Sequence, residues 1–600
     1  MILRYDSTEP DRCQGGSKLI RIFKHLQKRD WYYALATVAL IVFQVWLDLT
    51  MPDYTAKLTA AVSSGEIVKS EVWANGGMML LCAFGSMCAA IATGWFSSHI
   101  AAGFARTLRT RLFAKISTFS DREMNRFTTP SLITRTTNDV VQMQMLIAMG
   151  LQVIIKAPIL AVWAVCKISV TSVEWTTATM IAVIVMVATI GTVVSLCYPK
   201  FKKIQRLTDD LNDSTRENIT GVRVVRAFNA EDYQHAKFRR VNDEVTSNHL
   251  FTGRTMGLMS PVMTVCMSGL TLAIYWIGAV LMNRAADVPA RVQVIGNMTA
   301  FTQYALQVVM AFMMMIMIFI ILPRAAVSAR RINEVLDTTP AIVYEKALAP
   351  AEARGEVEFR NVSFTYPDAS TPCLTDISFH IRPGETFAII GATGSGKTSA
   401  VHLIPRFCDC TGGAVLLDGV NVTDYSKAQL ERVVSIAPQK AILFKGDIKS
   451  NVTYGAGEIA DDDPRIARAL EIAQADFVGE LEQGIHSEVA QGGTNFSGGQ
   501  KQRLSVARAV FKDAKVVIFD DTFSALDYKT DMLVRRQIRE KMRGVTVIIV
   551  AQRIGTIKNA DQILVLDEGR AVGLGTHEAL LETCPVYRDI ALSQLSKEEL

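Results

Sequence analysis

Apolar residues are unevenly distributed along this 600-residue chain. The first 335 residues or so contain long runs with few charges, whereas charged residues, glycines and short strand-like runs return from about Gly355. A membrane core about 30 Å thick requires about 20 apolar residues in a helix. The pattern therefore predicts two domains, the first in a membrane and the second in water.

The apolar runs predict six membrane-spanning helices, at about residues 31–52, 74–100, 147–173, 175–199, 257–283 and 297–322. Four of the underlying runs contain no Asp, Glu, Lys or Arg, and the first contains only Asp48. The third span is the weakest, because Lys156 and Lys167 interrupt it. Buried helices of a large soluble domain are the alternative, but soluble cores rarely need so many uncharged runs.

The basic residues predict the orientation of the chain. They gather before the first span, between the second and third spans and in residues 200–254, whereas residues 53–73 and 284–291 each carry only two. Both termini are therefore expected in the cytoplasm, in a multi-pass protein of the plasma membrane (the bacterial inner or cell membrane). Residues 1–30 lack the pattern of a secretory signal. The basic loops account for the net charge of +5, which gives no reason to expect nucleic acid as a partner.

The expected domain boundaries are 1–337 for the membrane domain, 338–354 for a linker marked by Pro340 and Pro350, and 355–600 for the second domain. Residues 104–128 alternate charged and apolar positions and contain no proline, which predicts one amphipathic helix. At 1.5 Å per residue it would extend about 37 Å beyond the membrane. The long cytoplasmic loops are therefore expected to project from the membrane as helices.

The second domain contains a phosphate-binding motif. Residues 387–390 read as a buried strand, and Gly391-Ala392-Thr393-Gly394-Ser395-Gly396-Lys397-Thr398 follows directly, before an expected helix. The glycines allow backbone N–H groups to approach phosphate, Lys397 can reach the β- and γ-phosphates, and the Thr398 hydroxyl can bind Mg²⁺. A second apolar strand, Val516–Asp520, ends in a carboxylate that can hold Mg²⁺ through water.

Between these strands lies Phe496-Ser497-Gly498-Gly499-Gln500, which resembles the LSGGQ signature of the ATP-binding cassette family. Six spans followed by one cassette resemble an exporter-type half-transporter, and residues 134–139 and 217–228 look like that group's cytoplasmic loops. The resemblance implies an all-α six-helix transmembrane domain followed by an α/β P-loop ATPase domain. ATP and Mg²⁺ are the implied cofactors.

The resemblance also assigns site residues, among them an aromatic that stacks on adenine (Tyr366) and a loop glutamine between the metal and the membrane domain (Gln439). The implied ATP-binding residues are Tyr366, Gly391, Thr393, Gly394, Ser395, Gly396, Lys397, Thr398, Ser399, Gln439 and Asp520. The implied metal ligands are Thr398, Gln439 and Asp520. In this family two cassettes pack head to tail, so a second group would meet the partner's ATP: Ser497, Gly498, Gly499, Gln500 and Asp527.

Two positions depart from the family pattern. The residue after Asp520 is expected to be the general base Glu, but here it is Asp521, whose side chain is one methylene, about 1.5 Å, shorter. The expected switch His is Gln552, which cannot carry a proton. Either the chain is a homodimer that tolerates both changes, or it pairs with a different half-transporter that supplies Glu and His. The regular signature beside an impaired catalytic pair favours the heterodimer, with slow hydrolysis at this chain's own site.

The substrate is less well defined by the sequence. Polar residues at membrane depth usually face a cavity or a partner, and methionines suit varied apolar ligands. The candidate cavity residues are Gln44, Asp48, Gln303, Gln307 and Met314. They favour a small amphipathic substrate of the multidrug type, with membrane lipid around the helices. A peptide or lipid exporter, an importer built on the same fold and a channel-like regulatory subunit remain open.

Overall fold

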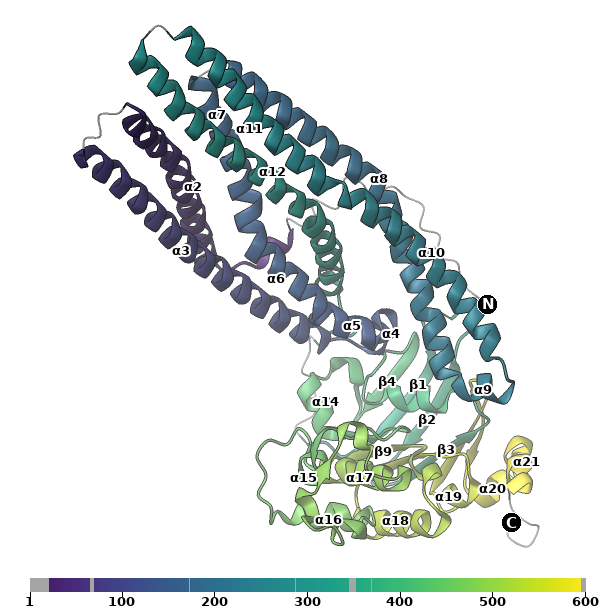
Figure 1. Ribbon diagram of the computed structural model, residues 1–600. Coiled ribbons are helices and arrows are strands. Elements are labelled where there is room, and N and C mark those ends of the chain that lie inside the picture. The colour runs from purple at the N-terminus through teal and green to yellow at the C-terminus, as the bar shows by residue number, and fades with distance from the viewer. Residues whose placement is uncertain are drawn as a thin grey trace. The chain divides into compact units, whose positions relative to one another are not determined.

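The computed structural model describes residues 21–64, 69–171, 173–285, 287–344, 352–367 and 369–594 (Figure 1). The chain forms two compact units. We call Met1–Ser117 with Thr129–Thr338 the helical unit, and Thr118–Thr128 with Thr339–Leu600 the sheet unit. Residues 345–351 of the expected linker lie outside the described residues.

Among the described residues, six helices are long and apolar enough to cross a membrane, which confirms the predicted number. The third of them, Thr129–Ser169, combines several consecutive elements. The elements of the helical unit are η1 (Phe23–His25), α2 (Lys28–Ser63), α3 (Lys69–Ile116), α5 (Thr129–Thr136), α6 (Asn138–Gly150), the π-helical turn η2 (Leu151–Lys156), α7 (Ala157–Thr171), α8 (Val173–Thr220), α9 (Val222–Ala227), α10 (Glu231–Gly257), α11 (Met259–Arg284) and α12 (Val288–Asp337).

The core of the helical unit lies between α2, α7, α11 and α12, where buried aliphatic and aromatic side chains form one cluster. Trp175 at the start of α8 is buried in it, packs against Phe301 and donates its indole N–H to the Ile274 carbonyl at 3.1 Å. Tyr304 from α12 donates to the Leu49 carbonyl at 3.2 Å. These contacts hold α2, α8, α11 and α12 together.

The prediction of a single helix over residues 104–128 was wrong. Helix α3 ends at Ile116, and a separate helix, α4 (Asp121–Phe127), begins after a break. At the break, the Ser120 backbone N–H donates to Glu123 Oε2 at 2.8 Å, in a capping box that starts α4. A capping box satisfies the free N–H groups of a new helix start and so favours a restart over continuation.

The described residues of the sheet unit form three sheets. The four-stranded sheet has the order β2-β1-β4-β5, the six-stranded sheet β12-β11-β3-β10-β9-β6, and the small sheet β7-β8. In the second, β11, β3, β10, β9 and β6 are parallel and β12 is an antiparallel edge. The strands are β1 (Val357–Phe364), β2 (Leu374–Ile381), β3 (Thr386–Gly391), β4 (Gly412–Leu417), β5 (Val420–Asn421), β6 (Val434–Ala437), β7 (Gly446–Asp447), β8 (Glu488–Val489), β9 (Val516–Asp520), β10 (Thr546–Val550), β11 (Gln562–Asp567) and β12 (Arg570–Gly575).

Alternating side chains of the six-stranded sheet enter two separate cores. Phe387 and Ile389 of β3 pack with α13 and the four-stranded sheet, whereas Ala388 and Ile390 pack with α16, α17 and α18 on the other face. The helices of this unit, besides α4 and short 3-10 turns, are α13 (Lys397–Leu403), α14 (Lys427–Val433), α15 (Ile448–Val452), α16 (Pro464–Ile472), α17 (Gly498–Phe511), α18 (Tyr528–Lys541), α19 (Ile554–Ile557), α20 (His577–Thr583) and α21 (Pro585–Gln594).

Candidate functional site

The phosphate loop connects β3 to α13 at the carboxyl end of the parallel strands, as the sequence predicted. Gly396 has φ of 93°, and a Cβ there would lie 2.7 Å from Leu374 Cδ2. A Cβ on Gly391 would lie 2.0 Å from the Leu566 carbonyl oxygen. Only glycine fits both ends of the loop. Between them, Thr393 and Gly394 are exposed at its crest, and Ser395 is buried.

Lys397 is the first residue of α13 and is buried. Its ammonium donates to the Gly391 carbonyl at 2.9 Å and to the Ala392 carbonyl at 2.7 Å. Burial lowers the pKa of Lys397, and the carboxylates of Asp521 and Asp520 act in the opposite direction. The cation is therefore held directly at the loop whose backbone binds phosphate.

Asp520 and Thr398 lie next to each other, as expected for shared metal binding. The Thr398 hydroxyl donates to Asp520 Oδ1 at 3.0 Å, and His402 Nε2 lies 3.7 Å from Asp520 Oδ2. Burial raises the pKa of Asp520, partly offset by the Thr398 hydrogen bond. His402 could not be predicted as a neighbour of Asp520 from the sequence, because a lone His on a helix gives no signal of this contact. Adjacent hydroxyl and carboxylate oxygens are the donors that Mg²⁺ prefers, so these residues fit the ion.

Tyr366 lies beside the phosphate-loop helix. Its hydroxyl is 2.9 Å from Ser399 Oγ, and its ring meets Phe364 edge to face at 4.7 Å between centroids. Burial raises the pKa of Tyr366. Tyr366 as a whole is 43% exposed, so part of it is accessible to a ligand such as a flat aromatic group.

Asp521 is contacted by two glutamines that are far apart in the sequence. Gln552 Nε2 donates to Asp521 Oδ2 at 2.8 Å, and Gln439 Nε2 donates to the same oxygen at 3.2 Å. Asp521 itself is buried and has φ of 46°. It lines a cavity of about 260 Å³ together with Ser524 and Gln552. Asp521 and the two glutamines therefore form one hydrogen-bonded group next to the carboxyl ends of β9 and β10.

The signature segment begins α17. Ser497 caps the helix: its backbone N–H donates to Gln500 Oε1 at 2.9 Å, and its Oγ accepts from the Gln500 N–H at 3.3 Å. Ser497 and Gly498 are exposed, and a Cβ on Gly498 would have no neighbour within 4 Å. Within the described residues, no hydrogen bond joins this segment to the phosphate loop. The start of α17 is therefore accessible from outside the chain at Ser497 and Gly498.

The loop after Asp521 contacts the signature helix. A Cβ on Gly499 would lie 3.6 Å from the Ala525 carbonyl oxygen. Asp527 is exposed and caps α18 by accepting the Thr530 N–H at 3.0 Å. This hydrogen bond lowers the pKa of Asp527. Phe496, where the family has Leu, is buried and tilted against Phe477.

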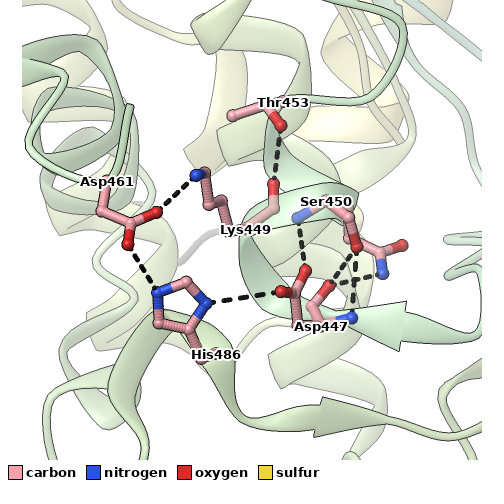
Figure 2. A network of polar contacts seen from close by, with 7 residues as sticks. Asp447, Lys449, Ser450, Thr453, Asp461 and His486 are labelled. Atoms are coloured by element: carbon pink, nitrogen blue, oxygen red, sulfur yellow. Dashed lines mark hydrogen bonds and ion pairs between the residues drawn. The ribbon is translucent and has the colours of Figure 1, made fainter. Parts of the chain in front are cut away.

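A network of polar contacts that the sequence did not predict connects residues lying between Gln439 and the signature segment in the chain (Figure 2). His486 Nε2 lies 3.0 Å from Asp461, and its Nδ1 lies 3.4 Å from Asp447, the N-cap of α15. Lys449 binds the other oxygen of Asp461. His486 is well separated in the chain from Asp447 and Asp461, so no sequence pattern predicts the contacts between them.

In the helical unit, two predicted cavity residues are brought together. Gln307 Nε2 donates to the Asp48 carbonyl at 2.8 Å, and the Asp48 carboxylate pairs with Lys156 and Ser86. Gln44 lies one turn before Asp48 on α2 and is buried. Along α12, Gln303, Gln307 and Met314 are spaced by four and seven residues, so they share one helix face, and each is half-buried.

Comparisons with known proteins identify the family. A model of the ABC transporter transmembrane region matches residues 33–312, and a model described as ABC transporter matches residues 374–524. An uncharacterized ABC transporter ATP-binding protein of Mycobacterium tuberculosis is 40% identical over 521 residues, 86% of this chain and 87% of that protein. The chain belongs to the ABC transporter family. This ABC transporter is an exporter-type half-transporter, a multi-pass membrane protein that binds ATP and couples its hydrolysis to transport.

Two further similarities concern other parts of the family. An ATP-dependent lipid A-core flippase of Pseudomonas fluorescens is 32% identical over 492 residues, 81% of this chain and 80% of that protein. The structure of a bacterial Atm1-family ABC exporter with ATP bound matches with a TM-score of 0.77 and 23% identity, over 95% of this chain and all of that one. The second similarity establishes the exporter fold.

Proposed function

We propose that this chain is one half of a heterodimeric exporter in which the two ATP sites work at different rates. The site at its own phosphate loop binds ATP and hydrolyses it slowly. Its signature segment, Ser497 to Gln500, completes the partner's faster site. The observation that carries this proposal is the pair of amide donors on Asp521 Oδ2.

The geometry at Asp521 is poor for a general base. A base must accept a proton from water within about 3 Å, and one of the two Asp521 oxygens already receives two N–H groups. The Asp side chain also ends about 1.5 Å short of where a Glu would reach. A misplacement of about 1 Å can cost about 100-fold in rate. Gln552 adds a hydrogen bond but cannot take or give a proton.

The same site retains the groups for binding ATP. Lys397 and the phosphate loop bind the phosphates, and Tyr366 stacks on the adenine ring. Thr398, Asp520 and the amide oxygen of Gln439 would hold Mg²⁺, which would supply charge neutralisation for the phosphates. We therefore expect this site to keep its ATP bound for longer than the partner's site needs to hydrolyse one ATP.

In the transport cycle, ATP binding draws the two sheet units together and opens the membrane cavity outward. Hydrolysis, mainly at the partner's site, resets it. The protein is placed in the cell membrane with both termini in the cytoplasm, since basic residues flank that side of the spans. The exposed start of α17 supports the dimer, because a helix N-terminus of this kind binds anions supplied from outside the chain.

The cargo proposed is a small amphipathic molecule, on the basis of polar and methionine side chains on one face of α12. A lipid is the second candidate, because several similar proteins carry the name lipid A-core flippase. Proteoliposome assays separate the two. Export of a fluorescent amphiphile without movement of labelled phospholipid supports the first, and the reverse supports the second.

The site proposal is tested by ATPase measurements on the chain purified alone and on the complex that copurifies with it. We expect the chain alone to hydrolyse ATP slowly, and Asp521→Glu combined with Gln552→His to raise its rate about tenfold or more, because the base regains its reach. An ordinary rate in the unaltered chain, unchanged by both substitutions, would reject the proposal.

A further inference from the structure

Asp48 of α2 and Lys156 of η2 form an ion pair within the helical unit. Lys156 Nζ lies 3.3 Å from Asp48 Oδ2, and the Ser86 hydroxyl donates to Asp48 Oδ1. The side chains of Lys156 and Asp48 are 18% and 26% exposed, so the pair is largely enclosed but reachable. An ion pair at membrane depth is costly and usually marks a functional position.

Lys156 reaches this position through an irregular helix segment. It is the last residue of η2, a π-helical turn between the α-helices α6 and α7. A π-helical turn is rare, is less stable than an α-helical turn and is often found at functional sites. Here the π-helical turn ends at Lys156, the residue that forms the ion pair with Asp48 of α2.

Gln307 supplies an acceptor that nothing in the described residues uses. The side-chain amide of Gln307 donates through Nε2 to the Asp48 carbonyl, and this hydrogen bond fixes which amide atom is the oxygen. That oxygen, Oε1, is buried and has no hydrogen-bond partner among the described residues. A buried acceptor without a hydrogen bond is energetically unfavourable. The cluster therefore contains a carboxylate already paired with Ser86 and Lys156 and an amide oxygen without a partner among the described residues. Both groups can accept hydrogen bonds from a cation with N–H groups.

We propose that Asp48 and Gln307 bind the ammonium group of an amphipathic amine, and that Lys156 is the resident counter-ion with which the amine competes. This inference rests on the proposed export of small amphipathic molecules and names their polar group. The amine and Lys156 carry the same charge and N–H donors, so exchange keeps Asp48 neutralised. The surrounding apolar helices contact the remainder of the molecule.

A second ion pair nearby provides a matched control. Lys167 Nζ lies 2.7 Å from Asp53 Oδ2, and Tyr304 donates to the other oxygen of Asp53. It links the same two stretches of chain, α2 and the segment through α7. It lies five residues further along α2, in regular α-helix, and is not assigned to the amine.

The test is equilibrium binding to the full-length chain, with any subunit that copurifies, in lipid nanodiscs. The probes are dansylcadaverine, which is a primary amine, its neutral N-acetyl derivative and a dansyl-labelled alkyl carboxylate. We expect the amine to bind about tenfold more tightly than the acetylated probe and Asp48→Asn to abolish that preference. Lys156→Met should tighten amine binding about fivefold, because it removes the competing cation. Asp53→Asn and Lys167→Met should stay within about twofold of the unaltered chain.

The opposite directions at Asp48 and Lys156 are what a merely structural ion pair would not produce. If Asp48→Asn and Lys156→Met both weaken amine binding, the pair is structural and the inference fails. It also fails if the carboxylate probe binds best and depends on Lys156. Equal binding of amine and acetylated probe overturns the inference but leaves amphipathic export in place. Binding of none of the probes overturns both.

Discussion

Among single residues, the most informative contacts are those of Asp521, whose carboxylate accepts hydrogen bonds from Gln439 and Gln552. The sequence identified the two unusual residues, Asp521 and Gln552, by their positions after buried strands. It did not predict that Gln439 and Gln552 donate to one carboxylate oxygen, because they are 82 and 31 residues away from it. Such contacts depend on how loops at the ends of parallel strands converge.

The phosphate loop makes a residue-level prediction. Gly396→Ala should lower thermal stability clearly, since the residue has φ of 93° and its Cβ would lie 2.7 Å from Leu374. Backbone strain of this kind costs about 1–3 kcal/mol, and the close contact adds to it. Thermal unfolding of the full chain measures the change.

Gly394→Ala is the matched control, because Gly394 has φ of 86° but open space around its Cβ position. It carries the backbone strain without the collision, so its loss of stability should be smaller. Equal losses for the two variants would show that packing against Leu374 contributes nothing.

At the scale of elements, buried strands were well predicted and helix interruptions were not. Apolar runs of the right length locate β3, β9 and β10, since both faces of these strands are buried. The break before α4 depends on one capping interaction at Ser120 and Glu123. The π-helical turn η2 has no signature in composition. Local polar contacts decided the first interruption, and the second follows no rule that the sequence displays.

Helix α4 gives an element-level prediction. Burial acts to raise the pKa of Glu123, but hydrogen bonds from Ser120 and from the Ala341 N–H lower it below its usual value. A carboxyl with a lowered pKa stabilises the fold above the pKa of the unfolded chain, 4.5, and loses that effect as pH falls through its folded value. The attachment of α4 should therefore be firm at pH 7 and weaken below about pH 4.5.

Hydrogen exchange of the α4 amides measures this attachment. Glu123→Gln should exchange about tenfold faster than the unaltered chain at pH 7, because hydrogen bonds to a charged acceptor are lost. The difference should vanish at low pH. Arg122→Gln, at an exposed neighbouring position, is the control and should have no effect. A pH-independent difference would assign the contact to packing rather than charge.

At the scale of the whole molecule, composition and motif order predicted the six spans and the following ATPase domain. These features depend on length and hydropathy, which a single sequence carries fully. The proposed dimer is different, because in it the signature helix of one chain would act on ATP held by another. The sequence and structure of one chain show that the helix start at Ser497 is exposed, but they do not show which group of a partner would bind there. The partner must be inferred from what Asp521 and Gln552 lack.

The most direct test of unequal ATP sites compares two substitutions in the complex purified with its partner. Gly498→Asp places a carboxylate, which this chain has room for, at the helix start that would meet the partner's ATP in the proposed dimer. We expect it to lower ATPase activity more than about tenfold, whereas Asp521→Asn should leave the rate within about twofold. ATP binding by the complex serves as the folding control. Equal losses, or a larger loss with Asp521→Asn, would contradict the account.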